Sequence, residues 1–155
     1  MTAIKSFAVL GDHVEILVTG EMSNGQSTML LETSPPGGGP PPHRHENEDE
    51  TFFVVEGEYE LLVDGEWVKG YPGDAFYRSR GTVHAFRNSG STTGKILVVV
   101  QPGGFENYLE QLSPLSVPAD LPKLIEISNR FGIFFPGISD SPAMLEPIAA
   151  VSDPA

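Results

Sequence analysis

Residues 37–57 read GGGPPPHRHENEDETFFVVEG, and this stretch says more about the fold than any other part of the chain. His43 and His45 lie two positions apart, so on a β-strand both side chains point to the same face. Two imidazoles on one face can bind one metal ion at about 2.0–2.2 Å each. By distance along the chain, the carboxylates that could complete the ligand set are Glu46, Glu48, Asp49 and Glu50. Taken alone, the segment is equally compatible with a solvated charged loop.

A second segment, residues 73–88, reads GDAFYRSRGTVHAFRN and contains one more histidine. His84 lies in a β-like run, so one face of a strand would carry it toward the interior. A single histidine on an apolar strand is usually a core residue with a satisfied hydrogen bond. Considered together with the His-x-His pair, His84 becomes a candidate third imidazole ligand.

The two segments together resemble the two sequence motifs of the cupin superfamily. The first motif is G, five residues, H-x-H, three or four residues, E, six residues, G, and its fixed positions are matched by Gly37, His43, His45, Glu50 and Gly57. The second motif is G, five residues, P-x-G, two residues, H, three residues, N, and it is matched by Gly73, Gly81, His84 and Asn88. Ser79 stands where the family usually has proline, which affects a turn and no ligand. The fifteen residues between the motifs, 58–72, are a short spacing typical of microbial cupins.

This resemblance implies both a ligand set and a fold. It selects Glu50 among the four carboxylates, so the implied metal ligands are His43, His45, Glu50 and His84. It also implies an all-β cupin jelly-roll barrel in which the ligands point inward and the ion lies at the bottom of a pocket. The segment PGGFENYLEQL, residues 102–112, further resembles single-domain members of the quercetin-dioxygenase-like branch.

The rest of the chain is consistent with such a barrel, because short β-like runs alternate with turn residues. Asp64-Gly65 is a strong signal for a two-residue hairpin turn. Residues 95–101 are apolar at five consecutive positions, which predicts a strand buried on both faces. The predicted strands cover residues 13–19, 27–33, 51–55, 59–63, 66–69, 74–78, 83–88 and 95–101.

After the last predicted strand, the apolar pattern changes to helical spacing. Residues 105–112 are expected to form one helix and residues 121–131 a second, with Asp120 as its cap and Pro122 in its first turn. We expect both helices to pack on the barrel, although the first could instead gate its mouth. The chain is thus interpreted as one domain, 1–155, with a barrel core at about 13–101, a helical extension at 105–132 and an extended tail at 133–155.

Composition excludes several classes of function. The absence of cysteine excludes thiolate metal ligands, cysteine nucleophiles and iron–sulfur clusters. The net charge of −12 disfavours nucleic acids and anionic membranes as partners. No signal-peptide pattern or apolar stretch of about 20 residues is present, so we expect a cytoplasmic protein. The expected partner is a small molecule, and the family resemblance further implies a homodimer.

The expected metal centre combines imidazole and carboxylate donors. This set suits one divalent transition metal, namely Fe, Mn, Ni, Co, Cu or Zn, and suits Ca or Mg poorly. Phe52 shares strand parity with Glu50, and Phe86 shares it with His84, so both rings are candidate pocket residues. Tyr77 is a further candidate, as a phenol donor.

These features lead to a functional hypothesis with two alternatives. The leading one is a metal-dependent dioxygenase that resembles quercetinases and acts on a small aromatic or enolisable substrate. In this hypothesis Glu50 is both a metal ligand and the catalytic base. The first alternative is a non-catalytic cupin that binds a metal or a small ligand. The second is a sugar isomerase or epimerase, which ranks lower because the expected interior is apolar.

Overall fold

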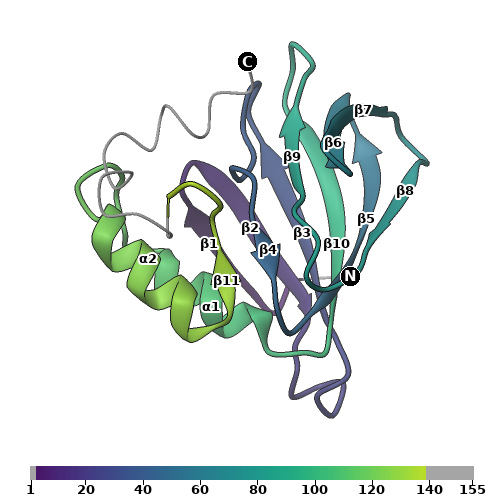
Figure 1. Ribbon diagram of the computed structural model, residues 1–155. Coiled ribbons are helices and arrows are strands. Elements are labelled where there is room, and N and C mark those ends of the chain that lie inside the picture. The colour runs from purple at the N-terminus through teal and green to yellow at the C-terminus, as the bar shows by residue number, and fades with distance from the viewer. Residues whose placement is uncertain (1–2, 139–155) are drawn as a thin grey trace.

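The structure is a computed structural model that describes residues 3–138. Its larger sheet has six antiparallel strands in the order β1-β2-β3-β10-β5-β8 (Figure 1). These strands are β1 (Lys5–Val9), β2 (Asp12–Val18), β3 (Thr28–Ser34), β10 (Gly94–Gln101), β5 (Asp49–Glu56) and β8 (Ala75–Arg78). The sequence patterns predicted all of them except β1.

The second layer is assembled from two smaller sheets. One has the order β7-β6-β9 and the other pairs β11 with β4. Their bounds are β7 (Glu66–Gly70), β6 (Tyr59–Val63), β9 (Ala85–Asn88), β11 (Ile133–Phe134) and β4 (Arg44–His45). His43 and His84 join the two sheets, because each residue donates its backbone N–H to the other's carbonyl oxygen, at 3.0 and 2.8 Å. The two layers enclose the core, which confirms the all-β jelly-roll prediction, although among residues 3–138 no single ladder closes into a continuous barrel.

Alternation along the strands decides which side chains enter the core. On β5, Glu50, Phe52 and Val54 are buried, whereas Phe53 and Val55 are exposed. On β10, the even-numbered Ile96, Val98 and Val100 are buried, and the residues between them are only half-buried. The prediction that β10 is buried on both faces was therefore wrong. On the outer face of this sheet, the side chains of β10 are only half-buried. An apolar run in the sequence therefore does not by itself indicate a strand that is buried on both faces.

The predicted hairpin between β6 and β7 is present. Asp64 and Gly65 both have positive φ, at 50° and 84°, which is the combination that a type I′ turn requires. Asparagine, aspartate and glycine tolerate this region of backbone space better than other residues. The Asp-Gly pair thus sets the register in which Val63 faces Glu66.

Both helices lie on the same side of the molecule, beside β1 and β11 (Figure 1). α1 (Phe105–Leu112) and α2 (Leu121–Arg130) lie where the sequence predicted them. They are held together in part by a 2.7 Å hydrogen bond between the hydroxyls of Tyr108 and Ser128, both of which are buried. Asp120 does not cap α2 as expected, because its carboxylate instead accepts a hydrogen bond from the backbone N–H of Ser116, at 2.8 Å.

The first residues after α2 belong to the folded core. Ile133 pairs with His45 through β11, and Ile133, Phe135 and Ile138 are buried. The predicted extended tail therefore begins with a strand, and residues 139–155 lie outside the described part of the chain. Within residues 3–138, no helix is long and apolar enough to cross a membrane.

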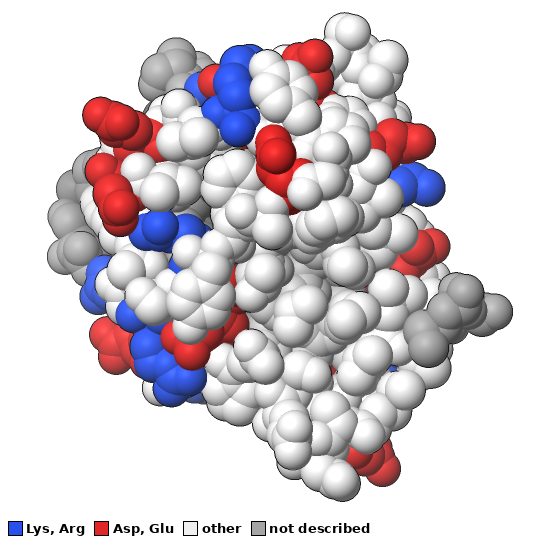
Figure 2. All heavy atoms as spheres, turned by 90° about the vertical axis from the view of Figure 1, so that its right-hand side faces the viewer, with Lys and Arg blue, Asp and Glu red and all other residues white. Residues whose placement is uncertain are grey.

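The side of the molecule opposite the helices carries few charged side chains at its centre (Figure 2). Among the exposed apolar side chains of the structure are Phe53 and Val55 on β5, and Tyr77 on β8. Isolated apolar groups are normal on protein surfaces. The expected homodimer stays a prediction.

Candidate metal centre and cavity

Three strand segments bring the four predicted ligands together. The backbone pairing of His43 with His84 sets these two residues directly opposite each other. His45 follows two positions later in β4 and points to the same side as His43. Glu50 comes from the opposite sheet, where the alternation of β5 turns it inward. Residues far apart in the chain thus meet at one point between the two layers.

The ligand atoms of these four residues all lie within 4.8 Å of one another. Two ligand atoms on opposite sides of an ion would be about 4.0–4.4 Å apart at ordinary metal–nitrogen and metal–oxygen distances. The side chains are also buried, with exposed fractions of 8% for His43, 1% for His45, 3% for Glu50 and 3% for His84. The arrangement is therefore of the right size for a single ion shielded from bulk solvent.

The orientation of each imidazole is set by a hydrogen bond at Nδ1. His43 Nδ1 donates to the carbonyl oxygen of Pro41 at 2.9 Å, and His84 Nδ1 donates to that of Thr82 at 3.1 Å. His45 Nδ1 donates to the carboxylate of Glu48 at 3.1 Å. A neutral imidazole with its proton on Nδ1 has its lone pair on Nε2. All three rings therefore present Nε2 as the ligand atom.

The electrostatics of the cluster favour a cation at its centre. Burial alone would raise the pKa of Glu50, but the adjacent imidazoles of His45 and His84 lower it to about 2. Burial lowers the pKa of His43 to about 3, and the two other imidazoles act in the same direction. Burial also acts to lower the pKa of His45, but Glu50 and Glu48 outweigh this effect and raise it.

The contacts around Glu50 show that a metal fits this site. Its Oε2 contacts His84 Nε2 and lies 3.2 Å from His45 Nε2, which is buried and has no hydrogen-bond partner among the described residues. A carboxylate oxygen and an imidazole lone pair are both acceptors, so a proton or a metal ion has to lie between them. Three imidazole nitrogens and one carboxylate oxygen suit a divalent transition metal.

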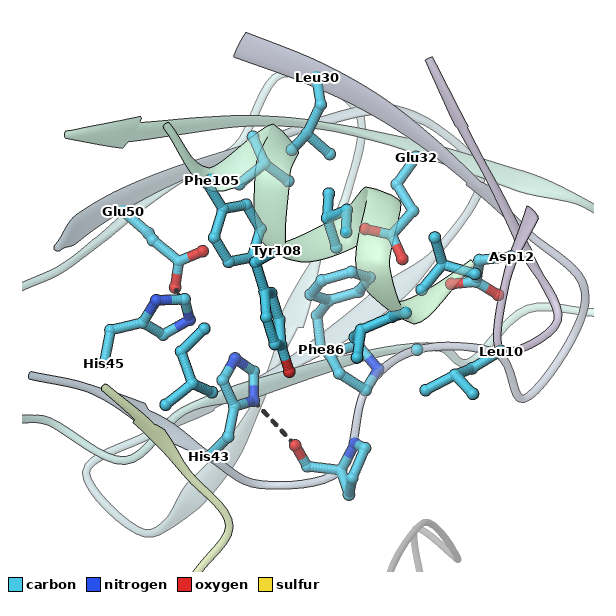
Figure 3. A pocket seen from close by; sticks show the side chains of 18 of the residues that line it. Leu10, Asp12, Leu30, Glu32, His43, His45, Glu50, Phe86, Phe105 and Tyr108 are labelled. Carbon is cyan, nitrogen blue, oxygen red and sulfur yellow. Dashed lines mark hydrogen bonds and ion pairs between the residues drawn. The ribbon is translucent and has the colours of Figure 1, made fainter. Parts of the chain in front are cut away.

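A cavity of about 160 Å³ opens from this cluster into the interior (Figure 3). Three of its polar lining residues are His43, His45 and Glu50. Most of the remaining wall is apolar, and α1 contributes to it through Phe105, Tyr108, Leu109 and Leu112. The first helix thus packs on the core, as expected, and also shapes the cavity.

The structure places two of the three predicted pocket residues in this wall. Phe52 and Phe86 are buried, line the cavity and lie with ring centroids 5.7 Å apart. Tyr77 does not line the cavity, and 59% of its surface is exposed. Its assignment to the pocket was wrong because Tyr77 pairs with Thr51, whereas Glu50 and Phe52 are the inward-facing residues of β5.

Sequence reasoning missed the roles of three acidic residues around the site. Glu48, considered only as a possible ligand, instead orients His45 through Nδ1. Asp12 and Glu32 line the part of the cavity opposite the metal cluster. A signal for Glu32 was present, because it shares strand parity with the buried Leu30 and so occupies a core-facing position.

Comparisons with known proteins agree with this architecture. Residues 30–100 match the family described as Cupin domain. Over 103 residues, 66% of this chain, the sequence is 31% identical to quercetin 2,3-dioxygenase of Bacillus subtilis (strain 168), and the match spans 30% of that protein's length.

Several solved structures are similar in fold to this chain. KdgF from Halomonas sp. gives a TM-score of 0.60 at 21% identity, covering 69% of this chain and 97% of that one. A sugar phosphate isomerase from Silicibacter pomeroyi gives a TM-score of 0.53 at 27% identity, covering 59% of each chain. These relatives carry different activities by name, so the activity of this chain has to be argued from its own site.

Proposed function

This chain belongs to the cupin superfamily, and from that premise we propose that it is a metal-dependent oxygenase acting on a small enolisable or single-ring aromatic molecule. The observation that carries the proposal is the position of the His43, His45, Glu50 and His84 cluster at one end of a mostly apolar cavity. Such a cavity with a few convergent polar groups is typical of small-molecule sites. The partial match to a quercetin dioxygenase supports oxygen chemistry.

The ligands, the base and the apolar wall of the cavity would have separate roles in this reaction. The three Nε2 atoms and the Glu50 carboxylate would hold one divalent Fe, Mn, Co, Ni, Cu or Zn ion. When bound, the metal supplies a Lewis acid that makes an enol or phenol hydroxyl more acidic. Glu50 then accepts the hydroxyl proton of the substrate, for which it must lie within about 2.6–3.2 Å of the donor oxygen. Phe52 and Phe86 hold the apolar body of the substrate and exclude water.

The size of the cavity limits the substrate. An engineered protein cavity of about 150 Å³ binds benzene, and the cavity found here is of similar volume, about 160 Å³. A single ring or a short dicarbonyl therefore fits, whereas a flavonol with three rings does not fit in the observed conformation. This argues for a substrate smaller than quercetin.

The charge of the cavity limits the substrate further. None of the described residues that line it is a lysine or arginine, while Asp12 and Glu32 contribute carboxyl groups. Anionic substrates such as sugar phosphates need cationic or other hydrogen-bond-donating groups to replace their hydration. The lining therefore weighs against the isomerase alternative and favours an uncharged substrate.

Oxygen consumption tests the proposal. The protein is loaded separately with Fe, Mn, Co, Ni and Cu, and oxygen uptake is followed with acetylacetone, with single-ring phenols and with a flavonol. We expect uptake with at least one metal and one of the small substrates, and slower or no uptake with the flavonol. Absence of uptake under every combination would contradict the oxygenase assignment and favour the non-catalytic alternative.

A further inference from the structure

The end of the cavity away from the metal cluster contains a pair of carboxyl groups that the proposed chemistry does not use. Asp12 lies at the start of β2, and Glu32 lies on the neighbouring strand β3. Both residues line the cavity. Figure 3 shows them on one side of it and His45 with Glu50 on the other, with Phe86 and Tyr108 between.

The two carboxyl groups are held by each other and by one hydroxyl. Glu32 and Asp12 are hydrogen-bonded to one another, and Ser34 Oγ donates to Asp12 Oδ2 at 2.9 Å. Asp12 is 5% exposed, and Glu32 is only partly exposed. Within residues 3–138, neither carboxyl has an ion pair with a lysine or arginine.

Without a cationic partner, the pair holds a proton more readily than two separate carboxyl groups do. Burial raises the pKa of Glu32 well above its ordinary value of 4.5, and the negative charge of Asp12 adds to this effect. Burial also raises the pKa of Asp12, although its hydrogen bonds with Glu32 and Ser34 oppose the rise. Two carboxyls that share one proton carry one negative charge and keep oxygen lone pairs free to accept a hydrogen bond.

A purely structural role accounts poorly for this pair. Burying charged groups costs free energy, and apolar residues of similar volume are often as stabilising or more so. His45, whose buried Nε2 has no hydrogen-bond partner in the part of the chain that the structure describes, lines the opposite end, so the cavity is polar at both ends and apolar between them. Such a distribution matches a ligand with polar groups at both ends.

We propose that Asp12 and Glu32 are specificity-determining residues, which accept a hydrogen bond from a hydroxyl group at the end of the substrate remote from the metal. The substrate class is then a small uncharged molecule with an apolar body, an enol or phenol oxygen at one end and a hydroxyl at the other. This inference rests on the metal centre and cavity of the proposed function and adds the requirement for the second hydroxyl.

Binding of two matched phenols tests the requirement. 4-(Hydroxymethyl)phenol and 4-ethylphenol have nearly the same size and differ in whether the terminal group is a hydroxyl or a methyl. Their affinities are measured by calorimetry on the zinc-loaded protein, in which no oxidation occurs. Hydrogen bonds to charged groups predict that the hydroxymethyl compound binds about ten- to a hundredfold more tightly.

Variants at the end of the cavity away from the metal cluster, the distal end, test whether the carboxyl pair causes that preference. Glu32→Leu is expected to reduce the ratio of the two affinities to about one. If the leucine variant does not fold, Glu32→Met is used in its place, because methionine is unbranched like glutamate. Leu10→Ala is the matched control, since Leu10 lines the cavity near Asp12 without a polar group. It should weaken both phenols alike and leave the ratio unchanged.

The possible outcomes separate the two proposals. A preference that is present in the wild type, lost in the Glu32 variants and kept in the Leu10 variant supports the inference. Equal binding of both phenols by the wild type, or a preference that survives in the Glu32 variants, overturns it and leaves the proposed function standing. If neither phenol binds the zinc-loaded protein, the phenol-binding metal site itself fails, and the inference that rests on it fails too.

Discussion

Two inward-facing carboxyl groups of the same sheet, Glu50 and Glu32, have pKa values shifted in opposite directions. Glu50 lies among three imidazoles, and its pKa is lowered to about 2. Glu32 lies beside Asp12, and its pKa is raised well above 4.5. Burial acts to raise the pKa of both groups, so the difference comes from their neighbours. One end of the cavity is therefore suited to hold a cation and the other to hold a proton.

The surroundings of the two ends differ for a structural reason. At the metal end, the acceptors Pro41, Glu48 and Thr82 occupy the Nδ1 atoms and leave the Nε2 atoms free to bind. At the distal end, the carboxyls use each other as partners. Carboxyl groups of one chain can thus serve as a metal ligand or as a hydrogen-bonding pair, depending on which strands surround them.

The largest expected effect is that of removing the ionised carboxylate from the metal end. Glu50→Ala should lower oxygen uptake by at least about a hundredfold, because it removes both a ligand and the proton acceptor. The comparison requires circular dichroism to show an intact barrel. Glu56→Ala, at an exposed position of the same strand, is the control and should retain full uptake. A protein that only binds metal would show weaker metal affinity and no turnover to lose.

The next effect concerns the residue that orients His45. Glu48→Ala should weaken metal binding by about 10- to 100-fold, because partners of ligating imidazoles typically contribute this much. Affinity is measured by competition with a chromophoric chelator. The control is Glu46→Ala, whose side chain is mostly exposed and contacts Arg44 instead of a ligand. Equal affinities of the two variants would show that the hydrogen bond to His45 Nδ1 has no influence on the metal.

A smaller effect on stability is expected at the distal end. Above pH 4.5 an ordinary glutamate loses its proton in the unfolded chain, whereas Glu32 keeps it in the folded protein. The free energy of unfolding should therefore fall with rising pH in the wild type relative to Glu32→Gln, which cannot ionise, by about 1.4 kcal/mol for each unit by which the pKa is raised.

Urea denaturation of the metal-free proteins at a series of pH values measures this difference. The two stability curves should run parallel below the ordinary glutamate pKa, where both states of the wild type are protonated, and the wild-type curve should fall relative to the other as the pH rises above it. Curves that stay parallel across the whole range would show that Glu32 is no harder to ionise in the folded protein than in the unfolded chain.

The smallest effect tests the correction made for Tyr77. Because its side chain lies outside the cavity, Tyr77→Phe should change phenol affinity by less than about twofold and stability by at most about 0.5 kcal/mol. Calorimetry and urea denaturation measure the two quantities. A loss of binding comparable to that in the Glu32 variants would place Tyr77 at the site after all.

Much of the architecture follows from local sequence patterns. Alternation predicted eight strands, and helical spacing predicted α1 and α2, because both periods report which side chains face the core. The strands β1, β4 and β11 were not predicted, and in β4 and β11 two residues are too few for a period to be visible. The burial of β10 was misjudged because an apolar run does not show whether a second layer covers its outer face.

The ligand set depended on a motif, because the geometry of a strand alone left four carboxylates open. Spacing relative to the glycines selected Glu50, and the structure places that residue with the three imidazoles. The roles of Glu48, Asp12 and Glu32 could not be derived in this way. Each depends on a partner whose position relative to it is set by strand pairing or by the path of a loop.

Eight strands and both helices could be predicted from the periodicity of the chain, and the four candidate ligands from its resemblance to the cupin motifs. The folded chain was needed to show that Asp12 and Glu32 face the same cavity as the metal cluster, that α1 forms part of its wall and that Tyr77 does not. The physical reason is that burial and electrostatic environment arise when segments distant in the chain pack together. A glutamate side chain therefore has a lowered pKa at one end of this cavity and a raised pKa at the other.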